Sequence, residues 1–184
     1  MKVIGVVGMP GSGKTTIANI AKNMGIRVVS MGDVVREWAA HAGMAMDDKS
    51  VGGFANDERR KFGNDIWAKR TIEKLIDDKG SDNVILIEGI RSIWEVNTFR
   101  KYLGNNFTLI AVICPPRVRF ERIRRRKRDD SPRNYDEFLE RDRREEGWGI
   151  LEAVKKADIQ IENTGSLEDF ISSVENILKG IVSD

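Results

Sequence analysis

Short apolar runs rich in β-branched residues alternate along the chain with longer segments of helical period. Several runs have the length and composition of buried strands. They are residues 3–7, 27–30, 84–88, 108–114 and 159–162. Parallel neighbours need a crossover between them, and a helix is the usual one. The pattern therefore predicts an α/β fold, in which a five-stranded parallel sheet is flanked by helices.

Two stretches depart from this alternation. Residues 36–79 form a long, mainly helical excursion between the second and third strands, and residues 115–157 do the same between the fourth and fifth. Insertions at the ends of parallel strands are common places for lids that cover ligands. We therefore expect residues 1–184 to form a single domain, with substrate contacts in these two insertions. Within the first, Gly52-Gly53-Phe54 predicts a loop, whereas residues 56–60 and 64–77 predict helices.

Composition agrees with one globular domain that buries a continuous core. Hydrophobic residues make up 40% of the 184 residues, and 31 basic side chains nearly balance 29 acidic ones. A basic site for nucleic acid would therefore have to be local. The first apolar segment is too short for a membrane span or a signal-peptide core, so we expect a cytoplasmic protein with no membrane partner. Cys114, Phe62, Trp67 and Trp148 are expected to pack in the interior.

A glycine-rich turn follows the first strand directly. Residues 8–15, GMPGSGKT, match the pattern G-x-x-x-x-G-K-[ST] at every position and open a helix. The backbone N–H groups of such a loop wrap phosphates, and the helix dipole adds positive potential there. Lys14 can reach the β- and γ-phosphate oxygens, while the Thr15 hydroxyl is suited to hold Mg²⁺. The residues predicted to bind ATP here are Gly8, Pro10, Gly11, Ser12, Gly13, Lys14, Thr15 and Thr16.

The P-loop predicts a nucleotide but not a reaction, because GTPases, motor ATPases, transporters and small-molecule kinases all share it. Glu88, at the end of the third strand, adds a carboxylate where the metal or its waters could be held. The alternative for Glu88 is an ion pair with a nearby arginine.

Two arginines follow the ends of successive strands. Arg36 ends the segment SMGDVVR, which resembles the T-G-D-x-x-R segment of adenylate and related nucleoside-monophosphate kinases. Arg91 ends the segment IEGIR, which resembles their D-G-x-P-R segment. In that family both arginines grip the phosphate of the acceptor nucleotide, so the resemblance implies an acceptor site at Asp33, Arg36 and Arg91. An arginine fork suits this role because it binds phosphate bidentately.

The second insertion contains a dense basic run. Residues 117–128 include seven arginines and one lysine, which is typical of a nucleic-acid patch or of a phosphoryl-transfer lid. Arg122 and Arg126 are four residues apart and share one helical face, and their segment resembles the helix that enters the lid of adenylate kinases. The resemblance implies that both act on the transferred phosphoryl group, with Arg141 on the returning side. The alternative is a solvated basic helix.

Residues 157–166, ADIQIENTGS, resemble the A-D-x-x-I-x-N-x-G-S stretch of dephospho-coenzyme A kinases. In these folds the loop after the fifth strand lies against the adenine of the donor. The resemblance therefore implies that Asn163 and Gly165 contribute backbone groups to ATP binding. An ordinary turn before a capped helix is the alternative.

Together these segments span nearly the whole chain, which resembles an adenylate-kinase-related family of P-loop proteins. The resemblance implies the P-loop NTPase fold, ATP and Mg²⁺ as cofactors, and transfer of the γ-phosphoryl group to a small phosphorylated acceptor. A nucleoside monophosphate such as AMP is the first acceptor to expect, and dephospho-coenzyme A is a second. The alternative is a nucleotide-switched ATPase that acts as an RNA- or protein-binding factor, although nucleic acid is the less favoured partner. The sequence does not indicate an oligomeric state.

Overall fold

The sheet is parallel throughout and has the strand order β2-β3-β1-β4-β5. The computed structural model describes residues 1–77, 83–125, 132 and 134–183. Its strands are β1 Lys2–Val7, β2 Arg27–Ser30, β3 Val84–Glu88, β4 Phe107–Ile113 and β5 Ile159–Glu162. The predicted fold class is confirmed, and β4 differs from its predicted bounds by one residue at each end.

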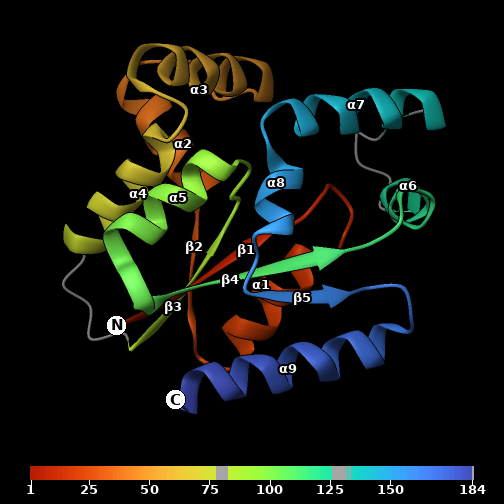
Figure 1. Cartoon of the computed structure of the whole chain (residues 1–184). Helices are drawn as coiled ribbons and strands as arrows, with labels where there is room; N and C mark the ends of the chain where they lie inside the picture. Colours follow the sequence, from red (N-terminus) through yellow and green to blue (C-terminus); the bar gives the residue numbers. More distant parts are fainter. Residues whose placement is uncertain (78–82, 126–131, 133, 184) are drawn as a thin grey trace.

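Helices cover both faces of the sheet (Figure 1). The helices α1 Lys14–Asn23 and α9 Leu167–Ser183 lie below it in that view. Above it lie α2 Met31–His41, α4 Ile66–Asp77, α5 Ile93–Leu103 and α8 Ile150–Lys155, and a short 3₁₀ turn, η1 Gly104–Asn106, connects α5 to β4. Because both faces are covered, the central strands are apolar at nearly every position rather than at alternate ones.

Successive residues of β1 show this two-sided burial. Val3 and Val7 join the core under α4, α5 and α8, together with Trp67 and Phe99. The intervening residues Ile4 and Val6 join the core under α1 and α9. Trp67 is 1% exposed, so its predicted interior position is confirmed.

The first insertion differs from its predicted local structure. Helix α3 runs from Asp48 to Phe62 and passes through Gly52 and Gly53, where a loop was predicted. The Asp47 carboxylate caps this helix by accepting a hydrogen bond from the Ser50 N–H at 2.9 Å. A strong N-cap stabilises a helix enough to offset part of the cost of internal glycines. Phe62 is 56% exposed, so its predicted place in the core is wrong.

The first part of the second insertion folds beyond the ends of β4 and β5 (Figure 1), whereas its last helix, α8, packs against the sheet. Helices α6 Pro116–Arg125 and α7 Tyr135–Gly147 pack around a small apolar cluster of Phe120, Ile123 and Phe138. Within the residues the structure describes, no helix has both the length and the apolarity needed to cross a lipid bilayer.

Candidate active site

The P-loop lies at the carboxyl end of β1 and is held closely by its neighbours. A Cβ atom at Gly11 would lie 2.9 Å from Ile123 of α6, and one at Gly13 would lie 2.4 Å from Asn163 Nδ2. Both glycines have positive φ values, 79° and 120°. The loop therefore needs glycine at these positions both for its backbone turn and for the close approach of α6 and the β5–α9 loop.

Lys14 is partly buried at the start of α1 and donates to the loop itself. Its Nζ donates hydrogen bonds to the Gly8 carbonyl at 2.6 Å and to the Met9 carbonyl at 3.1 Å. Burial, followed by the positive charge of Arg91, lowers the pKa of Lys14 to about 8. Burial thus disfavours the charged ammonium despite the opposing effect of Glu145 and Glu88, and an anion bound beside it would stabilise the charge.

The loop has the groups that a nucleotide phosphate and its metal require. The Ser12 side chain is fully buried, and its Oγ has no hydrogen-bond partner among the described residues. Thr15 is exposed at the first turn of α1, and Glu88 ends β3 close enough to affect the pKa of Lys14. An unpaired buried hydroxyl beside a helix N-terminus fits a phosphate oxygen. Thr15 and Glu88 fit the oxygen ligands of Mg²⁺.

Asn163 supports the P-loop with its side chain. Its Nδ2 donates to the Ser12 carbonyl at 2.7 Å, and its Oδ1 accepts from Arg122 at 3.0 Å. Its backbone N–H, which was expected near the adenine, donates to the Ile113 carbonyl at 2.8 Å. Gly165 is exposed in the turn before α9. The Asn163 side chain thus stabilises the P-loop, a role that the resemblance to the dephospho-coenzyme A kinase segment did not indicate.

The lid arginines differ sharply in their surroundings. Arg122 is partly buried and contacts Asn163 and the Cys114 Sγ, at 3.4 Å, so it reaches the edge of the P-loop. Arg126 lies outside the described residues. Arg119, which the sequence did not single out, is 3% exposed and donates to the Pro10 carbonyl at 3.1 Å and to Asp142 of α7. Arg119 therefore ties both lid helices to the P-loop.

A cavity of about 450 Å³ opens between the first insertion, the β3–α5 loop and the end of α7. Both arginines predicted to hold the acceptor line it, although they are far apart in the sequence. Its charged and polar lining consists of Arg36, Asn56, Arg59, Arg91, Glu95 and Arg141. Its apolar lining includes Met31, Val35, Val51, Ala55, Trp67 and Trp148. A cavity with an arginine-rich part and an apolar part suits a ligand that has an anionic end and a ring.

The two predicted arginines have different partners. Arg36 is exposed and pairs with Asp33 at 3.1 Å, three residues earlier on α2. Arg91 donates from NH1 to Glu145 Oε1 of α7 at 3.0 Å, and its guanidinium lies 5.8 Å from the Trp148 ring. Asp33 thus pairs with a cavity arginine rather than lining the cavity, so any part it has in acceptor binding acts through Arg36.

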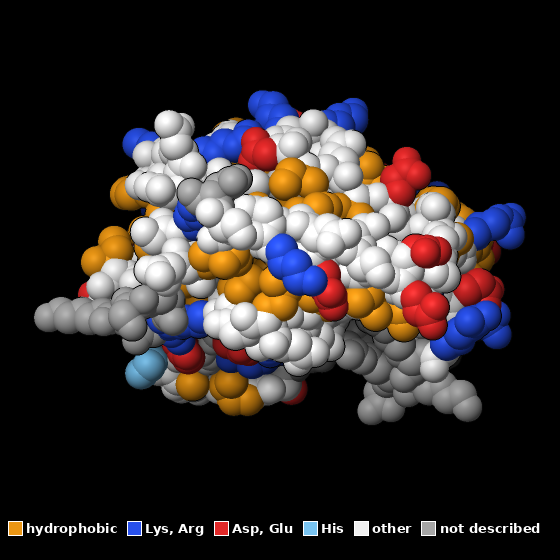
Figure 2. Space-filling model, turned by 90° about the horizontal axis from the view of Figure 1, so that it is seen from below, with side chains coloured by type: hydrophobic (Ala, Val, Ile, Leu, Met, Phe, Trp, Pro, Cys, Tyr) orange, Lys and Arg blue, Asp and Glu red, His pale blue; other side chains and the backbone are white. Residues whose placement is uncertain are grey.

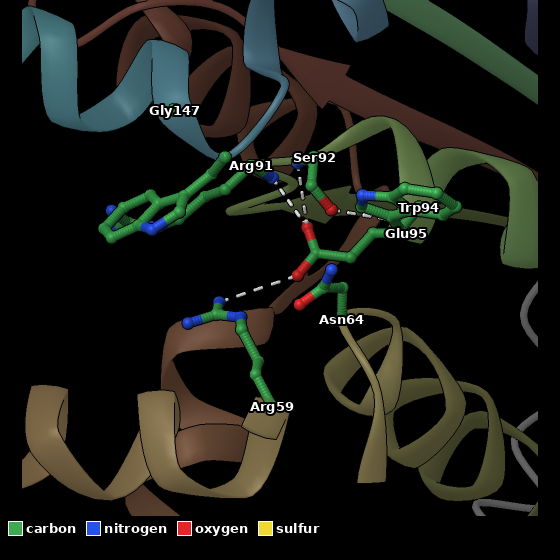
Figure 3. Close-up of a pocket in the computed structure, with 8 residues that line it drawn as sticks. Arg59, Asn64, Arg91, Ser92, Trp94, Glu95 and Gly147 are labelled. Atoms are coloured by element: carbon green, nitrogen blue, oxygen red, sulfur yellow. Dashed lines mark hydrogen bonds and ion pairs between the residues drawn. The ribbon is translucent and has the colours of Figure 1, made fainter. Parts of the chain in front are cut away.

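Glu95 lines this cavity and also a second pocket, drawn in Figure 3, which shares Arg59, Arg91 and Trp148 with it. Its carboxylate is 1% exposed and accepts from the backbone N–H groups of Arg91 at 2.7 Å and Ser92 at 3.2 Å. Its other oxygen lies 3.7 Å from Arg59 of α3. Burial raises the pKa of Glu95, and burial lowers the pKa of Arg59. Trp148 is 37% exposed and lies 5.7 Å from the Arg59 guanidinium, so its predicted place in the core is wrong.

Binding of Mg²⁺-ATP is expected to take up protons at weakly alkaline pH. The phosphates supply the negative charge that Lys14 lacks, so they should raise its pKa from about 8. Calorimetric titrations at pH 8 in buffers of different ionisation enthalpy should show an uptake of roughly half a proton per ATP. Affinity should fall as the pH rises above 8, where the free protein holds Lys14 neutral. An uptake that persists in Lys14→Met would contradict this assignment.

Family comparison agrees with the P-loop. A family model described as an AAA domain matches residues 7–138. A UPF0200/UPF0201 protein of Archaeoglobus fulgidus is 48% identical over 97% of this chain, which spans 55% of that protein's length. A UPF0200 protein of Methanocaldococcus jannaschii is 39% identical over all of this chain and 92% of its own length.

Solved structures share the architecture at low sequence identity. Shikimate kinase from Bacteroides thetaiotaomicron has a TM-score of 0.65 and 15% identity, with 100% of this chain and 99% of that chain covered. Dephospho-CoA kinase from Campylobacter jejuni has a TM-score of 0.60 and 18% identity, with 98% of each chain covered. The fold is therefore that of small P-loop kinases. On the strength of its family match and its UPF0200 relatives, the chain belongs to the UPF0200 family of proteins with an AAA-type P-loop domain.

Proposed function

We propose that this protein transfers the γ-phosphoryl group of ATP to a small phosphorylated acceptor, with a nucleoside monophosphate such as AMP as the first candidate. The observation that carries the proposal is the adjacency of two sites. The positive charge of Arg91 contributes to the lowered pKa of the P-loop residue Lys14, so the two side chains are near each other. Arg91 also lines the arginine-rich cavity. A donor phosphate and an acceptor phosphate held on these residues would be neighbours, which is the geometry that in-line transfer requires.

Each group has a distinct part in this reaction. Lys14 and the P-loop N–H groups hold the β- and γ-phosphates, and Arg36 and Arg91 hold the acceptor phosphate. An acceptor phosphate oxygen attacks the γ-phosphorus, the bond to the β-phosphate oxygen breaks, and ADP leaves. Because the attacking phosphate is already ionised, no general base is needed. Mg²⁺, held by Thr15 and Glu88, would neutralise phosphate charge. Arg122 would approach from the lid, as would Arg126.

The first insertion supplies the rest of the acceptor site. Arg59 of α3 is held near Glu95 on the cavity wall, and Val51, Ala55 and Trp67 form an apolar surface for a ring. Within the same fold, the structural neighbours that act on shikimate and dephospho-CoA indicate that the acceptor choice varies while the P-loop is kept.

The alternative, an ATP-driven RNA-binding factor, relied on the density of the basic run at 117–128. Of its arginines, Arg119 is buried in an ion pair and Arg122 contacts Asn163, which leaves fewer of the described ones for a nucleic acid. Among the described residues, the side chains on the face that includes α9 are a mixture of basic, acidic and apolar ones (Figure 2). These contacts favour the kinase.

A phosphoryl-transfer screen tests the proposal. Purified protein with Mg²⁺-ATP and a panel of nucleoside monophosphates plus dephospho-coenzyme A should form one phosphorylated product in step with ADP. Arg36→Ala and Arg91→Ala should each lower kcat/KM for that acceptor roughly 10- to 100-fold, because a charge-assisted hydrogen bond to phosphate is lost. Arg60→Ala is the matched control, since Arg60 lies beside Arg59 on α3 but is 78% exposed. Release of ADP and free phosphate without any acceptor product would overturn the proposal.

A further inference from the structure

One face of α7 contacts both the donor and the acceptor residues. Asp142, Glu145 and Trp148 are three residues apart at its C-terminal end. Asp142 pairs with Arg119, which donates to the P-loop carbonyl of Pro10. Glu145 pairs with Arg91, and Trp148 lies near Arg91 and Arg59. This face therefore bridges the P-loop and the acceptor cavity.

The Arg91–Glu145 contact is unusual for a residue assigned to bind a substrate. Glu145 Oε1 accepts from Arg91 NH1 at 3.0 Å, and the Glu145 side chain is only 9% exposed, whereas that of Arg91 is 49% exposed. A guanidinium fork binds a carboxylate and a phosphate with the same donor groups. The carboxylate of Glu145 thus uses a donor that an incoming acceptor phosphate would need.

We propose that Glu145 stands in for the acceptor phosphate at Arg91 and gives up that contact when the acceptor binds. This inference rests on the proposed function, because it assigns Arg91 to the acceptor. An acceptor must displace the carboxylate before it gains the arginine, so its apparent affinity is reduced by the strength of the ion pair. Release of Glu145 also removes one of the contacts that hold α7 over the cavity.

The same contact restrains Arg91 in the absence of an acceptor. Arg91 lies close enough to Lys14 to lower its pKa, and Glu145 acts on Lys14 in the opposite direction. On the proposed function Arg91 would lie near the γ-phosphate of a bound ATP, and its hydrogen bond to Glu145 at 3.0 Å would hold the guanidinium away from that phosphate. Arginines that reach the γ-phosphate accelerate its transfer to water as well as to an acceptor. The ion pair should therefore limit futile hydrolysis.

The test replaces Glu145 by an uncharged isostere. In Glu145→Gln, calorimetric titration without ATP should show AMP and inorganic phosphate binding about three- to tenfold more tightly than in the natural protein. Adenosine, which has no phosphate to compete for Arg91, should bind equally to both. Glu146→Gln is the matched control, because its side chain is the next one along α7 and is exposed. Glu145→Asp keeps the negative charge on a side chain that is one methylene shorter. It should give a smaller gain in AMP and phosphate affinity, which shows whether the charge or the length of the side chain matters.

The binding results decide whether Glu145 competes with the acceptor phosphate for Arg91. Unchanged or weaker binding of both AMP and phosphate in Glu145→Gln would overturn the inference, as would an equal change for adenosine. Failure of both ligands to bind any variant at millimolar concentration would overturn it as well. Tighter binding of phosphate, with no binding of any nucleoside monophosphate, would support the role of Glu145 and contradict the proposed acceptor. Higher acceptor-independent ATP hydrolysis in Glu145→Gln would support the restraint of Arg91.

Discussion

Lys14→Met is expected to lower kcat for phosphoryl transfer about 10²- to 10³-fold, which is the usual effect of removing one preorganised donor from a developing charge. The free energy of unfolding should change by less than about 1 kcal/mol, because Lys14 is only partly buried and burial already disfavours its charge. Steady-state kinetics with saturating acceptor, together with urea unfolding, would separate the two effects.

Lys22→Met is the matched control for this prediction. Lys22 is on the same helix as Lys14 and is exposed, so its loss should leave both kcat and stability close to those of the natural protein. A transfer rate in Lys14→Met within threefold of the natural rate would show that the P-loop does not carry the chemistry.

Arg119→Met is expected to lower the free energy of unfolding by about 3–5 kcal/mol, because it leaves the buried Asp142 carboxylate without its cation. For a chain of this size, such a loss lowers the melting temperature by roughly 6–20 °C. ATP affinity should fall as well, since Arg119 also donates to the Pro10 carbonyl of the P-loop. Urea unfolding and differential scanning calorimetry would measure the stability change.

Two further variants test whether the loss of stability in Arg119→Met comes from the broken ion pair or from the smaller side chain. Arg119→Met combined with Asp142→Leu should be more stable than Arg119→Met alone, because no unpaired charge remains in the interior. Arg124→Met, on the same helix but with a side chain that is 57% exposed, should change the unfolding free energy by less than about 0.5 kcal/mol. Equal stabilities for Arg119→Met and Arg124→Met would refute the structural role of Arg119.

The sequence predicted those features whose signals are local. Each strand is a short apolar run, and the P-loop is a contiguous motif, so periodicity and spacing were sufficient for both. Arg36 and Arg91 were found because their segments resemble the acceptor-binding segments of nucleoside-monophosphate kinases. Their positions after strand ends agreed with this, since parallel strands bring their carboxyl ends to one edge of the sheet. The structure places both arginines on one cavity, although their binding roles stay predictions.

The missed features depend on partners that are distant in the sequence. Arg119 donates to the carbonyl of Pro10, which is 109 residues away in the sequence. Arg91 donates to Glu145, which is 54 residues away. Arg59 and Glu95 lie on separate helices and are joined only by the packing of α3 near the start of α5. In the one-dimensional pattern, each looked like an ordinary charged helix residue. For Gly52 and Gly53 the local signal was wrong. Two adjacent glycines predicted a loop, but both lie within the capped helix α3.

For the proposed reaction, the strand order separates the helices that would select the acceptor from the loops that would hold the reacting phosphates. After β1, the chain forms β2 at the sheet edge and then makes the helices α2, α3 and α4 before β3 returns to lie directly beside β1. The P-loop and the Arg91 loop are thus fixed by two adjacent strands, whatever the intervening helices look like. Changes in those helices could therefore alter the acceptor of the proposed reaction without moving Lys14 relative to Arg91.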